Sequence, residues 1–155
     1  MSSNKTISCS LLLSLFSGAL KQNINIDKML EDLGLLDIHD AFNNKINPED
    51  LRVDLDDLSK LIRSLGREME DEACGFLNRP LKIGMFSMMC HAIITAGNLR
   101  RALLRSARFL QLLNEDLSIE LDESGDEARL TIHYSNPHQL DSIFFITSIF
   151  VIWIR

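Results

Sequence analysis

The hydrophobic pattern of the chain changes its period once, and this change limits the folds available to it. As far as Leu113, apolar residues recur at intervals of three and four, as they do on helices packed against a core. The segment LSIELDESGDEARLTIHY then alternates apolar and polar residues on both sides of the turn ESGDE, which predicts an antiparallel hairpin with one buried and one wet face. The predicted buried face consists of Leu117, Ile119, Leu121, Ala128, Leu130, Ile132 and Tyr134. We therefore expect an α+β fold, a mainly helical domain with a small antiparallel β-hairpin or sheet near the C-terminal third.

Helical spacing and capping residues place the helices that precede this hairpin. The predicted helices span residues 6–22, 27–33, 37–43, 55–66, 68–77, 85–96 and 99–113. Asp54 offers an N-cap to the fourth helix, which ends near Gly66, and Asn98 offers one to the last. The first helix has an apolar face that consists of Ile7, Leu11, Leu12, Leu15, Ala19 and Leu20.

Both ends of the chain carry apolar runs. The first 23 residues faintly imitate a signal peptide, because a lysine precedes the run. Ser14 interrupts that run, which favours an amphipathic helix packed on the core instead. Residues 143–154 are nearly all apolar, but they are too few to cross a bilayer, which takes about 20. Such a helix is either deeply buried or awaits a partner, so we expect a domain that is incomplete at its C-terminus and that contacts no membrane.

Size, charge and cysteine usage limit the class of protein further. A chain of 155 residues that is 46% hydrophobic can build one domain with a sizeable core. Its formal charge of -6 argues against a domain that neutralises DNA phosphates by itself. Cys9, Cys74 and Cys90 show no CxxC or Cys/His ligand spacing, so they predict neither a disulfide framework nor a zinc site. We expect a cytoplasmic protein without a cofactor or a metal ion.

Three groups of side chains have the chemistry of a catalytic or metal site but lack its spacing. Cys90 and His91 are helix neighbours that point about 100° apart, which favours a buried thiol beside a partly exposed imidazole over a reactive pair. His133 and His138 lack acidic ligands at suitable spacing. An acidic run without the glycine turn of a calcium loop is interpreted as a solvated helix face; it consists of Glu68, Glu70, Asp71 and Glu72. We therefore expect no enzyme.

The segment MFSMMCHAIITAGNLRRALLRSARFLQLL, residues 85–113, has the outline of a DNA-binding helix-turn-helix. Its second helix has an apolar sector, and the opposite sector of the same helix carries Arg101, Arg105 and Arg108. The apolar sector consists of Leu99, Ala102, Leu103, Ser106, Leu110 and Leu113. The first helix, however, is apolar nearly all round, and the second lacks base-reading side chains near its N-terminus. A buried helix followed by an amphipathic surface helix is the favoured interpretation.

Several segments between about residues 46 and 133 resemble the N-terminal, arabinose-binding-like regulatory domain of one branch of AraC-type transcriptional regulators. They are INPEDLRVDLDDLSKLIRSLGREMEDEACGFL, IGMFSMMCHAIITAGNLRRALLRSARFLQLL and the strand that ends in ARLTIHY. Residues 71–76 are similar to an Asp-x-x-x-Gly-Leu segment of that branch. Leu99, Ala102 and Leu103 reproduce its x-L-x-x-A-L pattern.

The resemblance implies a bacterial sensor that receives a small-molecule effector or supports dimerisation. In the family, such a domain is joined to a C-terminal domain of two helix-turn-helix units that binds promoter DNA, and we expect no counterpart of that domain within residues 1–155. We therefore expect residues 1–155 to be a regulatory domain that forms a homodimer and meets promoter DNA only through the missing domain. The alternative is a helical dimerisation or protein-interaction module without a small-molecule ligand.

Two sets of residues are candidates for contact with the effector or a partner. Thioethers and aromatics around a near-buried polar side chain make an adaptable pocket; the set consists of Met85, Phe86, Met89, Cys90, His91 and Phe109. The alternative, that these side chains simply fill the core, remains open. Arg101, Arg105 and Arg108 are candidates for contact with an acidic ligand headgroup, with the acidic segment 68–72, or with a partner surface.

Overall fold

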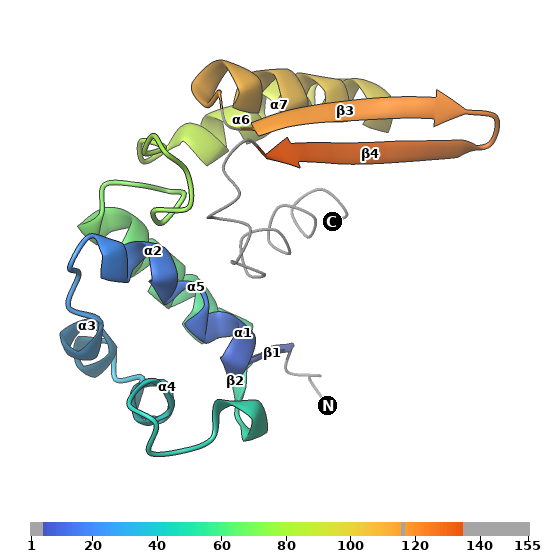
Figure 1. The fold of residues 1–155 in the computed structure, drawn as a ribbon. Coiled ribbons are helices and arrows are strands. Elements are labelled where there is room, and N and C mark those ends of the chain that lie inside the picture. The colour runs from blue at the N-terminus through green and yellow to red at the C-terminus, as the bar shows by residue number, and fades with distance from the viewer. Residues whose placement is uncertain (1–4, 116, 135–155) are drawn as a thin grey trace.

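The computed structural model describes residues 5–115 and 117–134, and their arrangement is α+β and mainly helical, as predicted (Figure 1). The elements are β1 (Thr6–Ser8), α1 (Cys9–Leu13), α2 (Phe16–Lys21), α3 (Ile26–Asp32), α4 (Leu36–Phe42), the 3-10 helix η1 (Pro48–Asp50), β2 (Arg52–Asp54), α5 (Leu55–Glu68), α6 (Met85–Ile94), α7 (Leu99–Leu113), β3 (Leu117–Ser124) and β4 (Glu127–Tyr134). The strands form two separate antiparallel pairs, β1 with β2 and β3 with β4. The predicted apolar helix over residues 143–154 and His138 lie outside the described residues.

Helices α1 to α5 surround the larger of two hydrophobic clusters. Phe16 is fully buried and meets Phe42 edge to face, with 5.4 Å between ring centroids. Helix α5 begins after Asp54, as predicted, and buries Leu61 and Leu65 against this cluster. A leucine at this depth stabilises the fold by about 1.5–3 kcal/mol relative to an exposed one.

The prediction of one continuous helix over residues 6–22 is wrong. Residues 6–8 form strand β1, in which Ile7 lies opposite Val53 of β2. Two short helices follow, because the Ser14 hydroxyl donates to the carbonyl oxygen of Leu11 at 2.7 Å and the chain turns at this point. The predicted apolar face is partly correct, since Leu12, Leu15 and Ala19 are buried, but Leu20 is 51% exposed.

The C-terminal hairpin forms as predicted, but its buried face is smaller than predicted: Leu117 and Ile119 are buried, whereas Ala128 is exposed. Ile119 lies opposite Ile132, Leu121 lies opposite Leu130, and a two-residue turn at Gly125 joins the strands. Helix α7 lies along this hairpin (Figure 1). A second, smaller cluster forms beneath it, and consists of Ala73, Leu77 and Leu117 with the partly buried Leu81 and Ile132.

Helix α6 is not the buried helix that its composition predicts. Met89 is its only buried residue, whereas Met88 and Ile94 are 62% and 82% exposed. The reason is the shape of this part of the chain: α7 covers one side of α6, the 71–84 segment meets its N-terminus, and no other described helix or strand packs closely against it. No helix in the described residues is long and apolar enough to cross a membrane.

Candidate functional site

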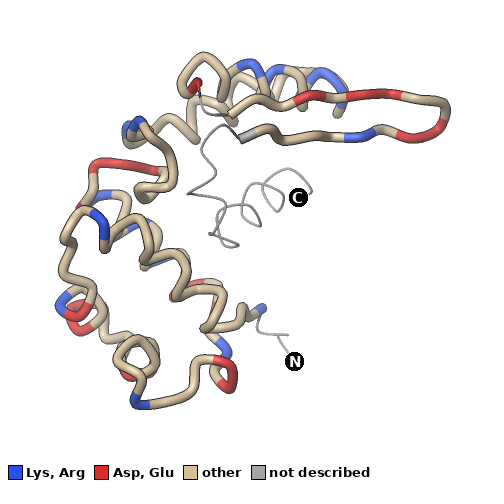
Figure 2. Tube along the Cα trace, in the orientation of Figure 1, with Lys and Arg blue, Asp and Glu red and all other residues tan. Residues whose placement is uncertain are grey.

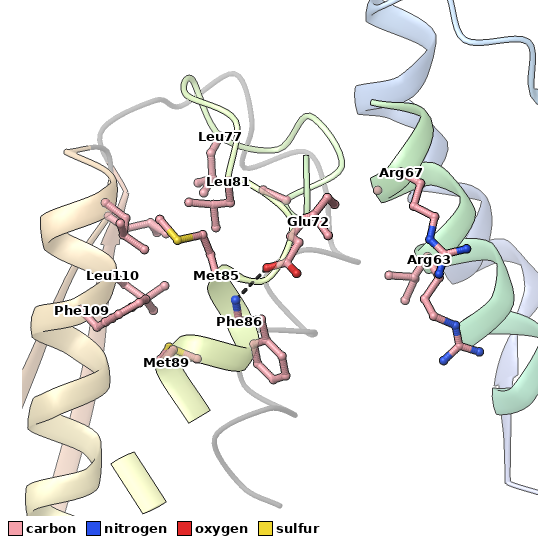
Figure 3. Close-up of a pocket in the computed structure, with 16 residues that line it drawn as sticks. Arg63, Arg67, Glu72, Leu77, Leu81, Met85, Phe86, Met89, Phe109 and Leu110 are labelled. Atoms are coloured by element: carbon pink, nitrogen blue, oxygen red, sulfur yellow. Dashed lines mark hydrogen bonds between the residues drawn. The ribbon is translucent and has the colours of Figure 1, made fainter. Parts of the chain in front are cut away.

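A cavity of about 600 Å³ lies between α5, the segment of residues 71–84, α6 and α7 (Figure 3). We call it the central cavity. Its lining is mainly apolar and comes from Ile62, Arg63, Gly66, Arg67, Glu72, Ala73, Leu77, Leu81, Ile83, Met85, Phe86, Met89, Phe109, Leu110, Leu113 and Leu117. The 71–84 segment is the wall that the hydrophobic pattern describes least well, because its conformation depends on polar contacts.

Asp71 holds the 71–84 segment in place from within. Its side chain is 1% exposed, and Oδ1 accepts hydrogen bonds from the backbone N–H groups of Ala73 at 2.8 Å and Leu81 at 2.7 Å. Oδ2 accepts from the N–H of Gly75 at 2.8 Å. Hydrogen bonds to an ionised carboxylate are stronger than neutral ones. One buried side chain therefore shapes a segment that has no helix or strand of its own.

Glu72 joins the same segment to the beginning of α6. Its Oε1 accepts from the N–H of Gly84 at 2.6 Å. Its Oε2 accepts from the N–H of Phe86 at 2.7 Å, which is the hydrogen bond drawn in Figure 3. The first N–H groups of a helix have no partner within the helix, so a carboxylate satisfies them and suits the positive end of the helix dipole. Both oxygens of Glu72 are therefore engaged by the backbone.

These contacts correct two predictions about residues 68–77. Residues 68–77 form no helix of their own, because α5 ends at Glu68 and the chain then turns through positive φ at Glu70, Cys74 and Gly75. The acidic run is also not a uniformly solvated face, since Asp71 is buried and Glu72 is half-buried. Charge spacing alone does not distinguish a carboxylate that faces water from one that caps a buried loop.

A close backbone approach ties this segment to α2. A Cβ added to Gly18 would overlap the carbonyl oxygen of Cys74 and would lie 2.9 Å from the Cα of Gly75. Burial raises the pKa of the Cys74 thiol to about 12, and the negative charge of Asp71 adds to this shift. Cys74 is therefore a protonated packing residue, not a reactive thiol.

Four of the six predicted pocket residues line the central cavity: Met85, Phe86, Met89 and Phe109. Cys90 and His91 are not among its lining residues. His91 is exposed, and its Nδ1 lies 2.7 Å from the carbonyl oxygen of Ser87 on the same helix. Contact of these four side chains with an effector stays a prediction.

The arginines of α7 lie elsewhere. Asn98 caps this helix as predicted, with Oδ1 accepting from the N–H of Arg101 at 2.9 Å. Arg105 Nη1 lies 3.3 Å from both the Ala92 carbonyl oxygen and Thr95 Oγ1, at the end of α6. Arg101, Arg105 and Arg108 are all exposed, and none lines the central cavity.

A further arginine of α7 contacts the hairpin. Figure 2 shows the basic residues of α7 beside the acidic residues of the hairpin, where Arg100 Nε donates to Glu123 Oε2 at 2.6 Å. The acidic residues that this helix meets are thus on β3. They are not in the 68–72 segment, whose last two carboxylates, Asp71 and Glu72, accept hydrogen bonds from backbone N–H groups.

Two cations that the sequence analysis did not single out do line the cavity. Arg63 and Arg67 lie one turn apart on α5, next to Ile62 and Gly66, which also face the cavity (Figure 3). Within the described part of the chain, neither guanidinium has a hydrogen bond or an ion pair. Their four-residue spacing beside Ile62 and Gly66 is the sequence signal that places both on the face of α5 that borders the cavity.

His133 is the described one of the two histidines that were considered as metal ligands. His133 Nε2 lies 3.2 Å from Glu120 Oε2 on the exposed face of the hairpin. In residues 5–115 and 117–134, no group of three His, Cys, Asp or Glu side chains is arranged to hold a metal ion. We therefore take the central cavity, with its mainly apolar lining, as the candidate functional site.

Comparison with known proteins gives one match. Residues 44–155 match the family described as the arabinose-binding domain of AraC transcription regulator, N-term. No match was found among curated proteins or among solved structures. The matched residues include every residue that lines the central cavity.

Proposed function

Because the chain belongs to the family of N-terminal arabinose-binding domains of AraC transcription regulators, we propose that it binds a small-molecule effector in the central cavity. Binding would control a C-terminal helix-turn-helix domain that contacts promoter DNA. The observation that carries the proposal is the cavity itself. Its volume of about 600 Å³ and its mainly apolar lining with a few polar groups are typical of small-molecule sites.

The elements around the cavity offer a route from binding to regulation. An effector in the cavity contacts α5, which belongs to the larger hydrophobic cluster, and also α6 and α7, of which α7 lies beside the hairpin. An effector that binds one arrangement of these elements more tightly shifts the population towards it. In the protein that carries the DNA-binding domain, this shift would change promoter affinity, and promoter DNA would change effector affinity by the same factor.

A pair of leucines on α7 allows a controlled test of the binding site. Leu110 lines the cavity, whereas Leu112 is 78% exposed on the same helix. A thermal-shift screen of bacterial metabolites identifies compounds that raise the melting temperature of the chain. Each hit is then measured on Leu110→Trp, which fills the cavity, and on Leu112→Trp, the control. Loss of the shift in Leu110→Trp alone supports the proposal; equal shifts in both variants would place binding elsewhere and contradict it.

A second function, an interaction module that forms a homodimer without a ligand, is favoured by one observation. Large apolar side chains on α6 and α7 are exposed, among them Met88, Ile94, Leu99 and Leu112. Exposed apolar side chains mark interaction sites where they form a contiguous patch. Sedimentation over a range of protein concentrations tests it: a dimer that weakens in Ile94→Asp, combined with no hit in the screen, favours this function over effector sensing. Either function would be exercised in the cytoplasm.

A further inference from the structure

We propose that the effector is an amphipathic carboxylic acid, whose apolar tail lies among α6 and α7 and whose carboxylate meets Arg63 and Arg67 of α5. This inference rests on the proposed function and adds the chemical class of the ligand. The inference follows from the positions of the charged side chains that line the cavity.

One wall of the cavity carries positive charge, on two exposed arginines that have no ion-pair partner among the described residues. Arg63 and Arg67 are the only basic residues among the lining residues, and both lie on α5. Like charges four residues apart on a helix repel each other, and within the described residues no acid lies within ion-pair distance of either. An anion between the two guanidinium groups relieves this repulsion and accepts charge-assisted hydrogen bonds.

The acidic residue of the cavity is already engaged. Glu72 directs both carboxylate oxygens to the backbone N–H groups of Gly84 and Phe86, at 2.6 and 2.7 Å. A cationic ligand could pair with Glu72 only by releasing the beginning of α6. The arrangement therefore favours an anionic ligand over a cationic one.

The opposite wall suits an apolar tail. Met89 is 4% exposed, and Leu77, Leu110 and Phe109 contribute aliphatic and aromatic surface around it. Thioether and aromatic side chains adapt to apolar groups of different shape. Figure 3 shows this wall on the side of the cavity away from Arg63 and Arg67. A ligand that spans the cavity thus needs a charged end and an apolar end.

Calorimetry with three ligands of equal tail length tests the proposal. Decanoate, decanol and decyltrimethylammonium are titrated into the chain, the two ionic ligands below their micelle concentrations and decanol below its solubility limit. We expect decanoate to bind roughly tenfold more tightly than decanol, from charge-assisted hydrogen bonds, and decyltrimethylammonium to bind most weakly. Octanoate, two methylenes shorter, should bind roughly tenfold more weakly than decanoate.

Variants separate the head from the tail. Arg63→Gln/Arg67→Gln should weaken decanoate roughly tenfold and leave decanol unchanged. The matched control, Arg101→Gln/Arg108→Gln, removes two exposed arginines of α7 that do not line the cavity and should leave both ligands unchanged. Leu110→Trp should weaken both.

The outcomes distinguish this inference from the proposed function. Equal binding of decanol and decanoate, with both lost in Leu110→Trp, overturns the anionic ligand but leaves effector binding in the cavity intact. Undiminished decanoate binding in Arg63→Gln/Arg67→Gln, or no decanoate binding to the unmodified chain, also overturns the anionic ligand. Decanoate binding that is unaffected by Leu110→Trp contradicts both proposals.

Discussion

At the scale of single residues, two neighbouring carboxylates organise the wall of the cavity. Asp71 accepts hydrogen bonds from the N–H groups of three residues that lie up to ten positions away, and Glu72 accepts them from two more at the beginning of α6. A buried backbone N–H without a partner is costly. These two side chains therefore substitute for the hydrogen bonds that a helix or strand would supply.

Replacing the buried carboxylate should be among the most damaging single changes in this chain. Asp71→Ala leaves three N–H donors without their acceptor, each worth about 1–3 kcal/mol when unsatisfied in the interior. We expect the free energy of unfolding in urea to fall by about 3 kcal/mol. Glu68→Gln, an exposed position in the same acidic run, is the control and should change it by less than about 0.5 kcal/mol. Similar values for the two variants would show that Asp71 is dispensable.

Cys74 gives the fold a dependence on alkaline pH. Its pKa is raised from 9.0 to about 12 by burial, so between these values the unfolded chain releases the thiol proton while the folded chain keeps it. The folded state then binds more protons, and stability falls as pH rises. From pH 7 to pH 10 this group should remove about 1 kcal/mol. Urea unfolding of the unmodified chain and of Cys74→Ala at both pH values measures the loss, which should be about 1 kcal/mol smaller in the variant, where Cys9, whose pKa burial also raises, still contributes; equal losses would contradict the assignment.

At the scale of elements, the sequence predicts the helices and strands in which the hydrophobic period repeats over enough residues to be unambiguous. The hairpin, the beginning of α5 and the Asn98 cap of α7 are as predicted, because each depends on local alternation, helical spacing or capping, although the Asp54 side chain that was expected to cap α5 makes no capping hydrogen bond. Strands β1 and β2 were not predicted. They have three residues each and lie more than 40 positions apart, so neither shows a period of its own.

The candidate site shows the same limit. The α6 and α7 walls of the cavity follow from an apolar and aromatic pattern, and four of their residues were singled out from the sequence. The α5 wall was not predicted, because the sequence alone does not distinguish Arg63 and Arg67 from ordinary surface charges. Their position is evident only when α5 is placed against the cavity. The exposure of α6 was not predicted either, since composition describes a helix but not how many neighbours cover it.

Two glycines on helices should respond oppositely to the same substitution. A methyl group on Gly18 of α2 would overlap the backbone at Cys74 and Gly75, whereas one on Gly66 of α5 finds its nearest neighbour at 3.4 Å. Gly18→Ala should therefore lower the free energy of unfolding by about 1–3 kcal/mol, as overpacking does. Gly66→Ala should raise it by about 0.5–1 kcal/mol through helix propensity. Urea titrations measure both, and a neutral Gly18→Ala would show that α2 and the 71–84 segment are not in close contact.

At the scale of the whole molecule, the cavity lies where two hydrophobic clusters adjoin. The larger cluster includes Leu61 and Leu65 of α5, and the smaller one joins the 71–84 segment to the hairpin through Leu77 and Leu117. The helices that border the cavity are therefore buried to different extents. On one side is α5, anchored in the core, and on the other is α6, with one buried residue.

This difference in burial predicts where the protein opens first and what a ligand changes. Amides in segments with few buried contacts exchange through local opening, whereas those in the core need near-global unfolding. We therefore expect deuterium exchange in residues 85–94 to be faster than in residues 61–68 by roughly two orders of magnitude. Mass spectrometry of peptides from the exchanged protein measures both.

Saturation of the cavity should then slow exchange in α6 and in residues 71–84, and leave α3 and α4 unchanged, because only the former border the cavity. Decanoate is the probe, and Leu110→Trp is the control in which its addition should change nothing. Equal protection of α5 and α6 without ligand would show that α6 is held as firmly as the core. Slower exchange throughout the chain, with no preference for the cavity wall, would show a general stabilisation without the local ordering on which effector sensing here depends.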